Sequence, residues 1–354
     1  MINYLKSKRL ISLFTLVFFS GIILMLSGCS NYYSGKVSDH FDGKNFYNPG
    51  KPKGEKAFAF LRWQLTSDKK PWPKSVKNIY KAAPPERVEG SKLLVTYVGH
   101  VTVLIQTEGL NILTDPIWSD RASPISWLGP KRVHEPGIEW EKLPKIDIVL
   151  VSHNHYDHLD LTTIERIWKR DKPRILVPLG NDTIIKNYND TIKVEAYDWG
   201  NTIAVKESIS IHLDPMHHWS ARGIADENEA LWAAFTLTSP NGNIYFVGDA
   251  GYGGGDNYRD ALKKYGSFRF AILPIGAYEP RWFMRYAHMN PEEAVQAYDD
   301  LGKPFTIPVH YDVFRLADEG YGEAGIALEE AKAKQYDDRF KQLKVGEQWD
   351  IPLK

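Results

Sequence analysis

The chain has 354 residues, of which 43% are hydrophobic and 25% are charged, with 44 basic and 44 acidic residues. This composition is typical of a globular protein with a sizeable core, and it excludes a disordered or fibrous chain. The balanced charge gives no indication of nucleic-acid binding, and a single cysteine excludes a disulfide framework. The core must therefore be held together by burial or by metal.

Residues 1–28 have the layout of a secretory signal peptide. A basic start precedes residues 10–28, which carry no charge and run directly into Cys29. The sequence LSGC resembles the lipobox of bacterial lipoproteins, in which cleavage precedes a cysteine that is then lipidated. An uncleaved transmembrane anchor is the alternative, since 19 uncharged residues could span a bilayer.

Both interpretations predict a membrane-anchored protein of the bacterial cell envelope that faces the periplasm or the exterior. Ser30 directly after the cysteine would allow sorting to an outer membrane if the cell has one. Residues 29–90 are rich in Lys, Pro, Gly and Trp, and they are predicted to form a tether and an N-terminal lead-in with a helix at residues 56–65. Residues 91–354 are predicted to form the folded domain.

Short apolar and β-branched runs predict a succession of strands from residue 92 onward. These runs cover residues 92–99, 102–109, 110–116, 146–153, 174–180, 208–215, 233–240, 243–250, 270–277 and 305–310. A helix is predicted to begin near Leu159, and two more cover residues 291–302 and 324–335. In the first of these two, Asn290 stands as N-cap and Pro291 at the first helical position. Adjacent strands, with a hairpin signal at Asn241–Gly242, favour mixed sheets over a doubly wound parallel sheet.

The stretch HNHYDH, from His153 to His158, follows one of these predicted strands directly. Two histidines separated by one residue in a turn can converge on one ion, while Asp157 and His158 at the start of a helix can face a second ion. Imidazole nitrogen and carboxylate oxygen are ligands that zinc accepts. Because protonated histidines at this density would repel one another, the cluster predicts a metal site.

Further candidate ligands stand at the ends of other predicted strands, where a loop side chain is exposed on a rigid scaffold. They are His217, His218, Asp249 and His310. Each of them taken singly would more often be an ordinary turn residue. His212 alternates within a strand and is predicted to be packed or at the surface. The glycine-rich GDAGYGGGDNY lacks the Gly-Lys-Ser/Thr ending of a phosphate-binding loop and is interpreted as a loop around Asp249.

HNHYDH matches the HxHxDH signature of the metallo-β-lactamase superfamily. This resemblance implies an αββα sandwich of two mixed β-sheets flanked by helices, with a di-metal site. Longer segments resemble N-acyl-phosphatidylethanolamine-hydrolysing phospholipase D from about residue 42 to the C-terminus. These segments are VTYVGHVTVLI, LTDPIWSDRASPISWLGPKR, VLVSHNHYDHLD, PIGAYEPRWFM and HMNPEEAV.

The resemblance also implies a role for individual residues. One zinc ion would be held by His153, His155 and His218. The other would be held by Asp157, His158 and His310, with Asp249 bridging the two ions. His218 is preferred to His217 because the family's histidine stands directly before a tryptophan, here Trp219. Tyr156 and His288 would contact the substrate, and Asp115 and His100 would orient the ligands from behind.

The predicted function is that of a zinc-dependent phosphodiesterase, with iron or manganese as the alternative metals. It would cleave N-acyl-phosphatidylethanolamine to phosphatidic acid and N-acylethanolamine, with Asp157, Asp249 and His288 as the catalytic residues. Two metal ions suit in-line attack of water on a phosphodiester. The expected partners are a phospholipid and the membrane, with no nucleic acid, and the resemblance implies a homodimer.

Two other functions compete with this interpretation. The same fold and metals could serve a lactonase or another small-molecule hydrolase of the superfamily. A non-catalytic envelope lipoprotein is the second alternative, although a binding scaffold has no need to keep seven metal ligands. The apolar residues with which the animal enzyme associates with membranes have no evident counterpart in this sequence, so the substrate is less certain than the chemistry.

Overall fold

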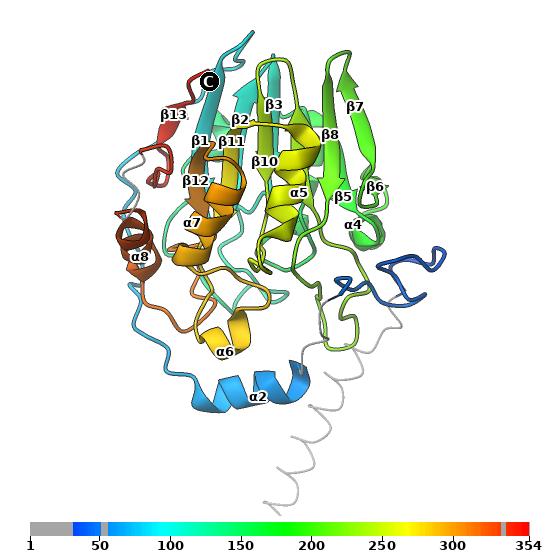
Figure 1. Ribbon diagram of the computed structural model, residues 1–354, viewed down its shortest axis with the longest axis vertical. Helices are drawn as coiled ribbons and strands as arrows, with labels where there is room; N and C mark the ends of the chain where they lie inside the picture. The colour runs from blue at the N-terminus through cyan, green and yellow to red at the C-terminus, as the bar shows by residue number, and fades with distance from the viewer. Residues whose placement is uncertain (1–30, 51–55, 334–337, 354) are drawn as a thin grey trace, which may run out of the picture.

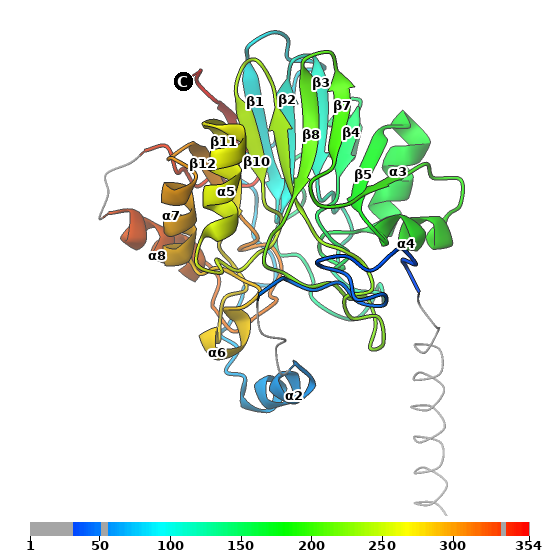
Figure 2. The same ribbon diagram turned by 45° about the vertical axis from the view of Figure 1, so that its right-hand side comes forward.

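The structure is a computed structural model that describes residues 31–50, 56–333 and 338–353. Two β-sheets pack face to face, and helices cover the outer face of each (Figures 1 and 2). The predicted signal peptide and the lipidated Cys29 lie outside the described residues.

The first sheet has the strand order β13-β1-β2-β3-β4-β5-β6. Its strands are β1 (Leu93–Gly99), β2 (Thr102–Thr107), β3 (Leu110–Thr114), β4 (Ile148–Leu150), β5 (Arg174–Pro178), β6 (Glu195–Tyr197) and β13 (Gln348–Asp350). The strands from β13 to β3 pair antiparallel, and those from β3 to β6 pair parallel.

The second sheet has the strand order β12-β11-β10-β9-β8-β7. Its strands are β7 (Thr202–Lys206), β8 (Ile209–Asp214), β9 (Ala234–Thr238), β10 (Asn243–Phe246), β11 (Phe268–Pro274) and β12 (Phe305–Val309). The strands from β7 to β10 pair antiparallel, and those from β10 to β12 pair parallel. The predicted hairpin turn is confirmed between β9 and β10, where Gly242 takes a left-handed φ of 110°.

The helices lie on the two outer faces of this sandwich (Figure 2). The first sheet is covered by α3 (Leu161–Asp171) and α4 (Asn181–Tyr188). The second is covered by α5 (Asp256–Tyr265), α7 (Pro291–Asp300) and α8 (Glu323–Lys332). Three shorter or peripheral helices are α2 (Lys56–Thr66), η1 (Trp140–Lys142) and α6 (Arg281–Met284). The predicted αββα sandwich of two mixed sheets is thus confirmed.

Strand β11 shows why the central strands are largely apolar. Phe270 and Ile272 enter the core between the sheets, whereas Ala271 and Leu273 face the layer of helices α5, α7 and α8. Because successive side chains of a strand point to opposite faces, a strand covered on both sides is apolar at most positions. The exception in β11 is Arg269 near its start, which donates to backbone carbonyls such as that of Ile351. All seven residues of β11 are buried.

Some elements differ from those predicted. Helix α3 begins at Leu161, two residues later than expected, because the side chain of Asp160 caps it by accepting a hydrogen bond from the Thr163 amide. The last three residues of the glycine-rich stretch interpreted as a loop, Asp256 to Tyr258, form the first turn of helix α5, which the sequence did not predict. Among the described residues, the other elements that the sequence did not predict are η1, α4, α6, β6, β7 and β13.

The lead-in before the sandwich is packed against the domain. Phe41 and Phe46 are each 1% exposed and join the core between the second sheet and its helices. The rings of Phe41 and Tyr33 meet edge to face, with 5.0 Å between their centroids. The predicted helix of the lead-in is present as α2, whose Trp63 packs on α6.

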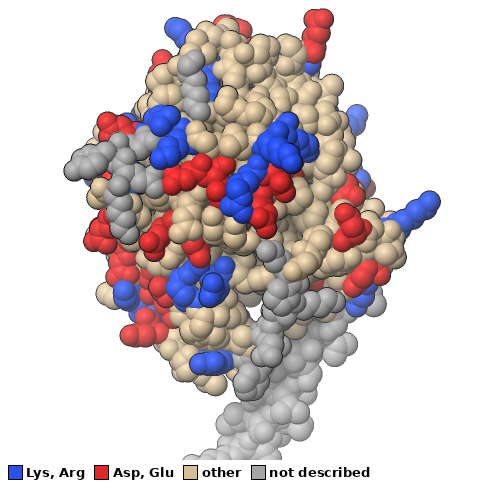
Figure 3. Space-filling view, in the orientation of Figure 1, with Lys and Arg blue, Asp and Glu red and all other residues tan. Residues whose placement is uncertain are grey.

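Acidic and basic side chains intermingle over the face drawn in space-filling form (Figure 3). Within residues 31–50, 56–333 and 338–353, no helix is both long and apolar enough to cross a membrane.

Replacing Phe41 with alanine is expected to lower the free energy of unfolding by about 3 kcal/mol, since the variant leaves a cavity against Phe46 and Tyr33. Urea denaturation at a fixed metal concentration measures the change. Val37→Ala is the matched control, because Val37 is 69% exposed in the same segment. Equal midpoints for the two variants would show that the lead-in does not contribute to the fold.

Candidate metal centre

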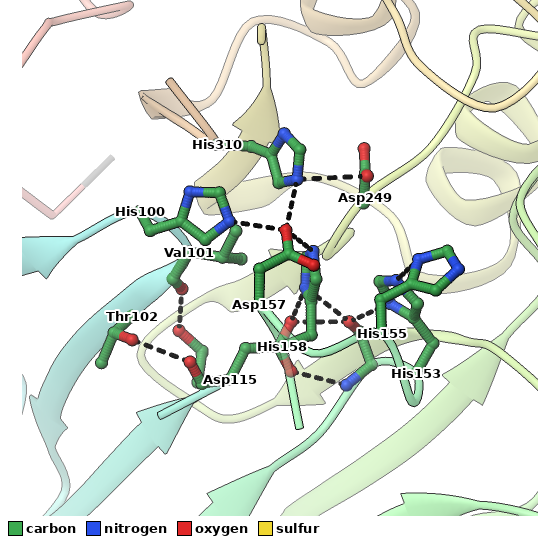
Figure 4. Close-up of polar contacts among 12 residues, drawn as sticks. His100, Val101, Thr102, Asp115, His153, His155, Asp157, His158, Asp249 and His310 are labelled. Atoms are coloured by element: carbon green, nitrogen blue, oxygen red, sulfur yellow. Dashed lines mark hydrogen bonds and ion pairs between the residues drawn. The ribbon is translucent and has the colours of Figure 1, made fainter. Parts of the chain in front are cut away.

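The candidate ligands come from segments that are far apart in sequence and meet at one end of the sandwich. His153 and His155 follow β4, His218 follows β8, Asp249 follows β10 and His310 follows β12. Figure 4 shows His310 and Asp249 across from Asp157 and the HNHYDH turn. The side chains of these residues are almost entirely buried, except for that of His155, which is partly exposed.

Three imidazoles form the first group of potential ligands. The Nε2 atom of His153 lies 2.8 Å from Nδ1 of His155 and 3.1 Å from Nε2 of His218. The distance between the His155 and His218 nitrogens is 3.3 Å. Three nitrogen atoms therefore face one small volume.

Hydrogen bonds fix which nitrogens carry lone pairs in this group. His218 donates from Nδ1 to the carbonyl of Ala287 at 2.9 Å, so its Nε2 is an acceptor. Nδ1 of His153 lies 2.9 Å from the hydroxyl oxygen of Ser152. Because that hydroxyl donates to Asp115 at 2.6 Å, His153 donates to it and keeps its lone pair on Nε2. Lone pairs that face one another at these distances fit a cation placed among them.

The second group combines histidines with a carboxylate. Oδ2 of Asp157 lies 3.1 Å from Nε2 of His310 and 3.3 Å from Nε2 of His158. His100 donates from Nε2 to the same oxygen at 2.8 Å. The structure therefore places His100 as close to the group as the predicted ligands, where it holds Asp157 in position.

Asp249 lies between the two groups, as expected of a bridging ligand. Its Oδ2 is 3.2 Å from Nε2 of His310 in the second group and 3.7 Å from Nε2 of His218 in the first. Among the described residues, the combinations of three or more side chains that could hold an ion include all seven predicted ligands. The donor set is nitrogen and carboxylate oxygen throughout, which suits zinc, iron or manganese.

Asp115 anchors the turn that carries the cluster (Figure 4). Its Oδ2 accepts a hydrogen bond from Nδ1 of His158 at 2.7 Å, which turns Nε2 of His158 toward Asp157. Its Oδ1 accepts from the backbone amide of Ser152 at 2.6 Å. A carboxylate behind a histidine is the usual partner that fixes the orientation and the tautomer of a metal ligand.

Burial keeps the first group of imidazoles neutral. It lowers the pKa of His155 to about 3, and it holds the pKa of His153 and of His218 well below the ordinary value. The charge of His158 reinforces this effect at His153, whereas the charge of Asp249 opposes it at His218. Neutral imidazole is the form that binds a metal ion.

The second group is charged. Burial opposes ionisation of Asp157, but the charge of His158 and the hydrogen bonds from His100, His158 and His310 hold its pKa well below the ordinary value. Burial likewise opposes protonation of His158, yet Asp157 and Asp115 raise its pKa to about 10. An ion at Nε2 of His158 must displace this proton, so metal binding here releases a proton and weakens at low pH.

Tyr156 is not brought into the cluster. Its hydroxyl donates to the carbonyl of Arg222 at 2.9 Å, and the Arg222 guanidinium lies 3.9 Å from the centroid of its ring. The same guanidinium donates to the carbonyls of Asn154 and Leu159. Arg222 thus stabilises the HNHYDH turn through hydrogen bonds at both of its ends, and Tyr156 packs against Arg222.

His288 is brought to the site. Its Nδ1 lies 3.0 Å from Oδ2 of Asp249. The segment that carries it is held at both ends, since Arg281 donates to its carbonyl and the amide of Met289 donates to the carbonyl of Ala250. His288 is therefore placed beside the bridging carboxylate.

Sequence reasoning missed several residues that support the site. Ser152, Arg222 and the carbonyl of Ala287 orient ligands or the turn that bears them. Only Ser152 carried a local signal, because it directly precedes HNHYDH. His217 and His212 lie outside every group of potential ligands among the described residues.

The fold and the donor set define a metal-dependent hydrolase of the metallo-β-lactamase fold. The family model described as beta-lactamase superfamily domain matches residues 110–311, and the chain belongs to this family. A solved metallo hydrolase of Ignicoccus hospitalis superposes with a TM-score of 0.54 and 20% identity, covering 74% of this chain and 100% of that one.

Relatives of known sequence extend the likeness over most of the chain. A Caenorhabditis elegans protein named N-acyl-phosphatidylethanolamine-hydrolyzing phospholipase D 1 is 33% identical over 333 residues, which is 87% of this chain and 93% of the relative. An uncharacterized protein of Mycobacterium tuberculosis is 37% identical over 257 residues, or 72% of this chain. That match spans 66% of the mycobacterial protein, just under two thirds of its length.

Asp115→Asn is expected to weaken metal binding by about 10- to 100-fold, because an amide holds His158 less firmly than a carboxylate does. Zinc titration of the apoprotein against a competing chelator measures the affinity. Asp182→Asn is the control, since Asp182 pairs only with Lys186 on the surface of α4. Unchanged affinity in Asp115→Asn would show that Asp115 does not support the site.

Proposed function

We propose that the protein is a zinc-dependent phosphodiesterase that cleaves N-acyl-phosphatidylethanolamine to phosphatidic acid and N-acylethanolamine. The observation that carries this proposal is the 33% identity to the nematode phospholipase, which extends over 93% of that enzyme. A likeness of this extent includes the segments outside the metal-binding motif, and those segments differ most among hydrolases of one fold.

The chain's own side chains would hold two divalent cations. His153, His155 and His218 offer three nitrogens to one cation, and Asp157, His158 and His310 offer two nitrogens and a carboxylate to the other. When bound, the cations would supply the Lewis acid that activates water and neutralises phosphoryl charge. Asp249 lies where it can hold both.

His288 is suited to handle a proton of the substrate. Its Nδ1 contacts Asp249, and Nε2 has no hydrogen-bond partner within the part of the chain that the structure describes. The side chain is 14% exposed, so a bound substrate can reach it. An imidazole held at one nitrogen and open at the other can donate a proton to a leaving oxygen or orient a phosphate.

The surface near His288 supports a membrane substrate. Helix α2 exposes Phe60, Leu61 and Leu65 at 51%, 54% and 79%, and Trp282 of the neighbouring α6 is 44% exposed. Arg62 lies 4.5 Å from the centroid of the Trp282 ring, which joins the two helices. Helix α6 leads directly into the segment of His288, whose amide donates to the carbonyl of Met284. Exposed aromatic and aliphatic side chains with a basic neighbour suit the boundary of a lipid layer.

The proposal includes the location of the protein. Lipidation at Cys29 would tether it in the bacterial cell envelope, facing the periplasm or the exterior, and at the outer membrane where the cell has one. The phospholipid would then be reached from the membrane that holds the anchor. The active form would be a homodimer.

The full chain in non-ionic detergent, loaded with zinc, is expected to release phosphatidic acid and N-acylethanolamine from N-acyl-phosphatidylethanolamine. Mass spectrometry of both products measures the reaction, with bound metal quantified in the same sample. Asp157→Asn should lower the rate by at least about a hundredfold, since the carboxylate of the second group is lost.

The other outcomes separate the competing functions. A protein that holds its metal and hydrolyses a lactone, but not the phospholipid, would indicate a different hydrolase of the family. No turnover of any phosphodiester or lactone, with an unchanged cellular phenotype in Asp157→Asn, would favour the non-catalytic lipoprotein.

His288→Gln is expected to lower kcat by about 100-fold or more while bound metal is unchanged, because glutamine can hydrogen-bond but cannot transfer a proton at neutral pH. Steady-state rates with metal content measured in parallel test this. Loss of a metal ion in the variant would instead assign His288 to the ligands.

A further inference from the structure

A cavity of about 600 Å³ lies away from the metal centre, between residues 76–79, helix α8 and residues 342–345. This volume is in the range of pockets that hold small molecules. None of its lining residues belongs to a group that could hold a metal ion among the described residues. The cavity is therefore a separate site.

The walls are largely apolar. Val76, Ile79, Val313, Ile326 and Val345 line them. Ile79 and Ile326 are 78% and 62% exposed, so the apolar lining continues to the mouth. Such walls suit a hydrocarbon body.

Tyrosines form the floor of the cavity. The rings of Tyr97 and Tyr311 stack with their centroids 6.4 Å apart and an angle of 10° between their planes. The hydroxyl of Tyr97 donates to the carbonyl of His100 at 3.3 Å. A third ring, that of Tyr321, lines the cavity beside them.

One carboxylate, that of Asp312, stands among these rings. Asp312 lines the cavity together with Tyr97, Tyr311 and Tyr321. Asp312 accepts one hydrogen bond, at 2.7 Å from the amide of Gly322. Within the described part of the chain it forms no ion pair.

Among the described residues, no cationic side chain forms an ion pair with this carboxylate. Lys77 and Lys344 line the cavity but are exposed, and neither lies within ion-pair distance of Asp312. His134 is neutral, because burial, Arg132 and Lys344 lower its pKa. Its ring nitrogens are occupied by Asn78 at 2.8 Å and by Tyr321 at 2.9 Å.

The outer rim is mixed in charge. Glu329 and Glu330 of α8 also line the cavity and balance the two lysines. Figure 3 shows acidic side chains gathered on the side of the molecule where α8 lies. The rim thus does not select for an anion, and the acid that lines the cavity together with the tyrosines is Asp312.

We propose that this cavity binds a primary alkylammonium ion. The ammonium group sits against the carboxylate of Asp312 and the faces of Tyr97, Tyr311 and Tyr321, and the alkyl chain lies along Val76, Ile79 and Ile326. A charge-assisted hydrogen bond and cation–π contacts hold the head, and burial of hydrocarbon holds the tail. An alkyl carboxylate meets Asp312 with like charge and is rejected.

The test is isothermal titration of the zinc-loaded full chain in non-ionic detergent with hexylammonium chloride, corrected for partition into micelles. Hexanol and hexanoate are the matched probes, since they keep the chain and change the head group. One hexylammonium is expected to bind per protein, at least about tenfold more tightly than either matched probe.

Asp312→Asn is expected to weaken hexylammonium by about tenfold or more, with hexanol unchanged. Asparagine tolerates the left-handed φ of 56° at this position, so the backbone is kept. Glu330→Gln is the matched control: it removes the same charge at the rim and leaves the affinity within about twofold.

Ile326→Arg tests the proposal independently of the fold around Asp312, because Ile326 lies on the exposed side of α8. The new cation at the wall is expected to weaken hexylammonium by about tenfold. The proposal is overturned if hexanol or hexanoate binds as tightly as the amine, or if neither Asp312→Asn nor Ile326→Arg weakens the amine.

Discussion

Two carboxylates and five imidazoles buried in one place form the constraint on which the rest of this structure depends. Asp157 and Asp249 are both out of solvent, and both are held ionised by the histidines around them. The Nε2 atoms of His153 and His218, which both carry lone pairs, face each other at 3.1 Å and add a second unfavourable arrangement. Burying unpaired charge and lone pairs costs several kcal/mol per group, roughly, and cations placed among them remove both costs. The apolar sandwich thus holds in place a polar group that bound metal ions would stabilise.

The backbone at this end of the sandwich shows how the constraint is met. His100, Asp115 and His310 each stand directly after a strand and have φ values of 58°, 32° and 65°. Left-handed backbone in such residues costs about 1–3 kcal/mol each and persists only where the surroundings impose it. The left-handed backbone turns the chain directly after each strand, so that the side chain of each of these residues points toward the metal centre. Gly276, which follows β11, allows the backbone of His310 to lie close to it. A Cβ at this position would stand 1.9 Å from the carbonyl oxygen of His310.

The sequence could predict what is local and could not predict what depends on distant packing. HNHYDH predicted a metal site because its donor side chains lie within six residues of one another in sequence. The αββα fold was predicted from the family resemblance that this motif carries. Sequence spacing alone did not decide which residues after the other strands are ligands. His218 was preferred to His217 because a tryptophan follows it directly. Arg222 and the Ala287 carbonyl could not be found, since they act through backbone groups that only the folded chain brings together. Strands β6 and β13 have three residues each and form only by pairing with a neighbouring strand. They are too short to show a periodic pattern in the sequence.

Asp115 links the two groups of ligands through one carboxylate. Its Oδ2 accepts from Nδ1 of His158, which belongs to the second group, and from the hydroxyl of Ser152. That hydroxyl in turn accepts from Nδ1 of His153, which belongs to the first group. The orientations of two potential ligands, one in each group, are therefore set by one buried acid on the turn after β3. Since each of these ligands presents its lone pair only in one tautomer, the two groups are organised together rather than one at a time.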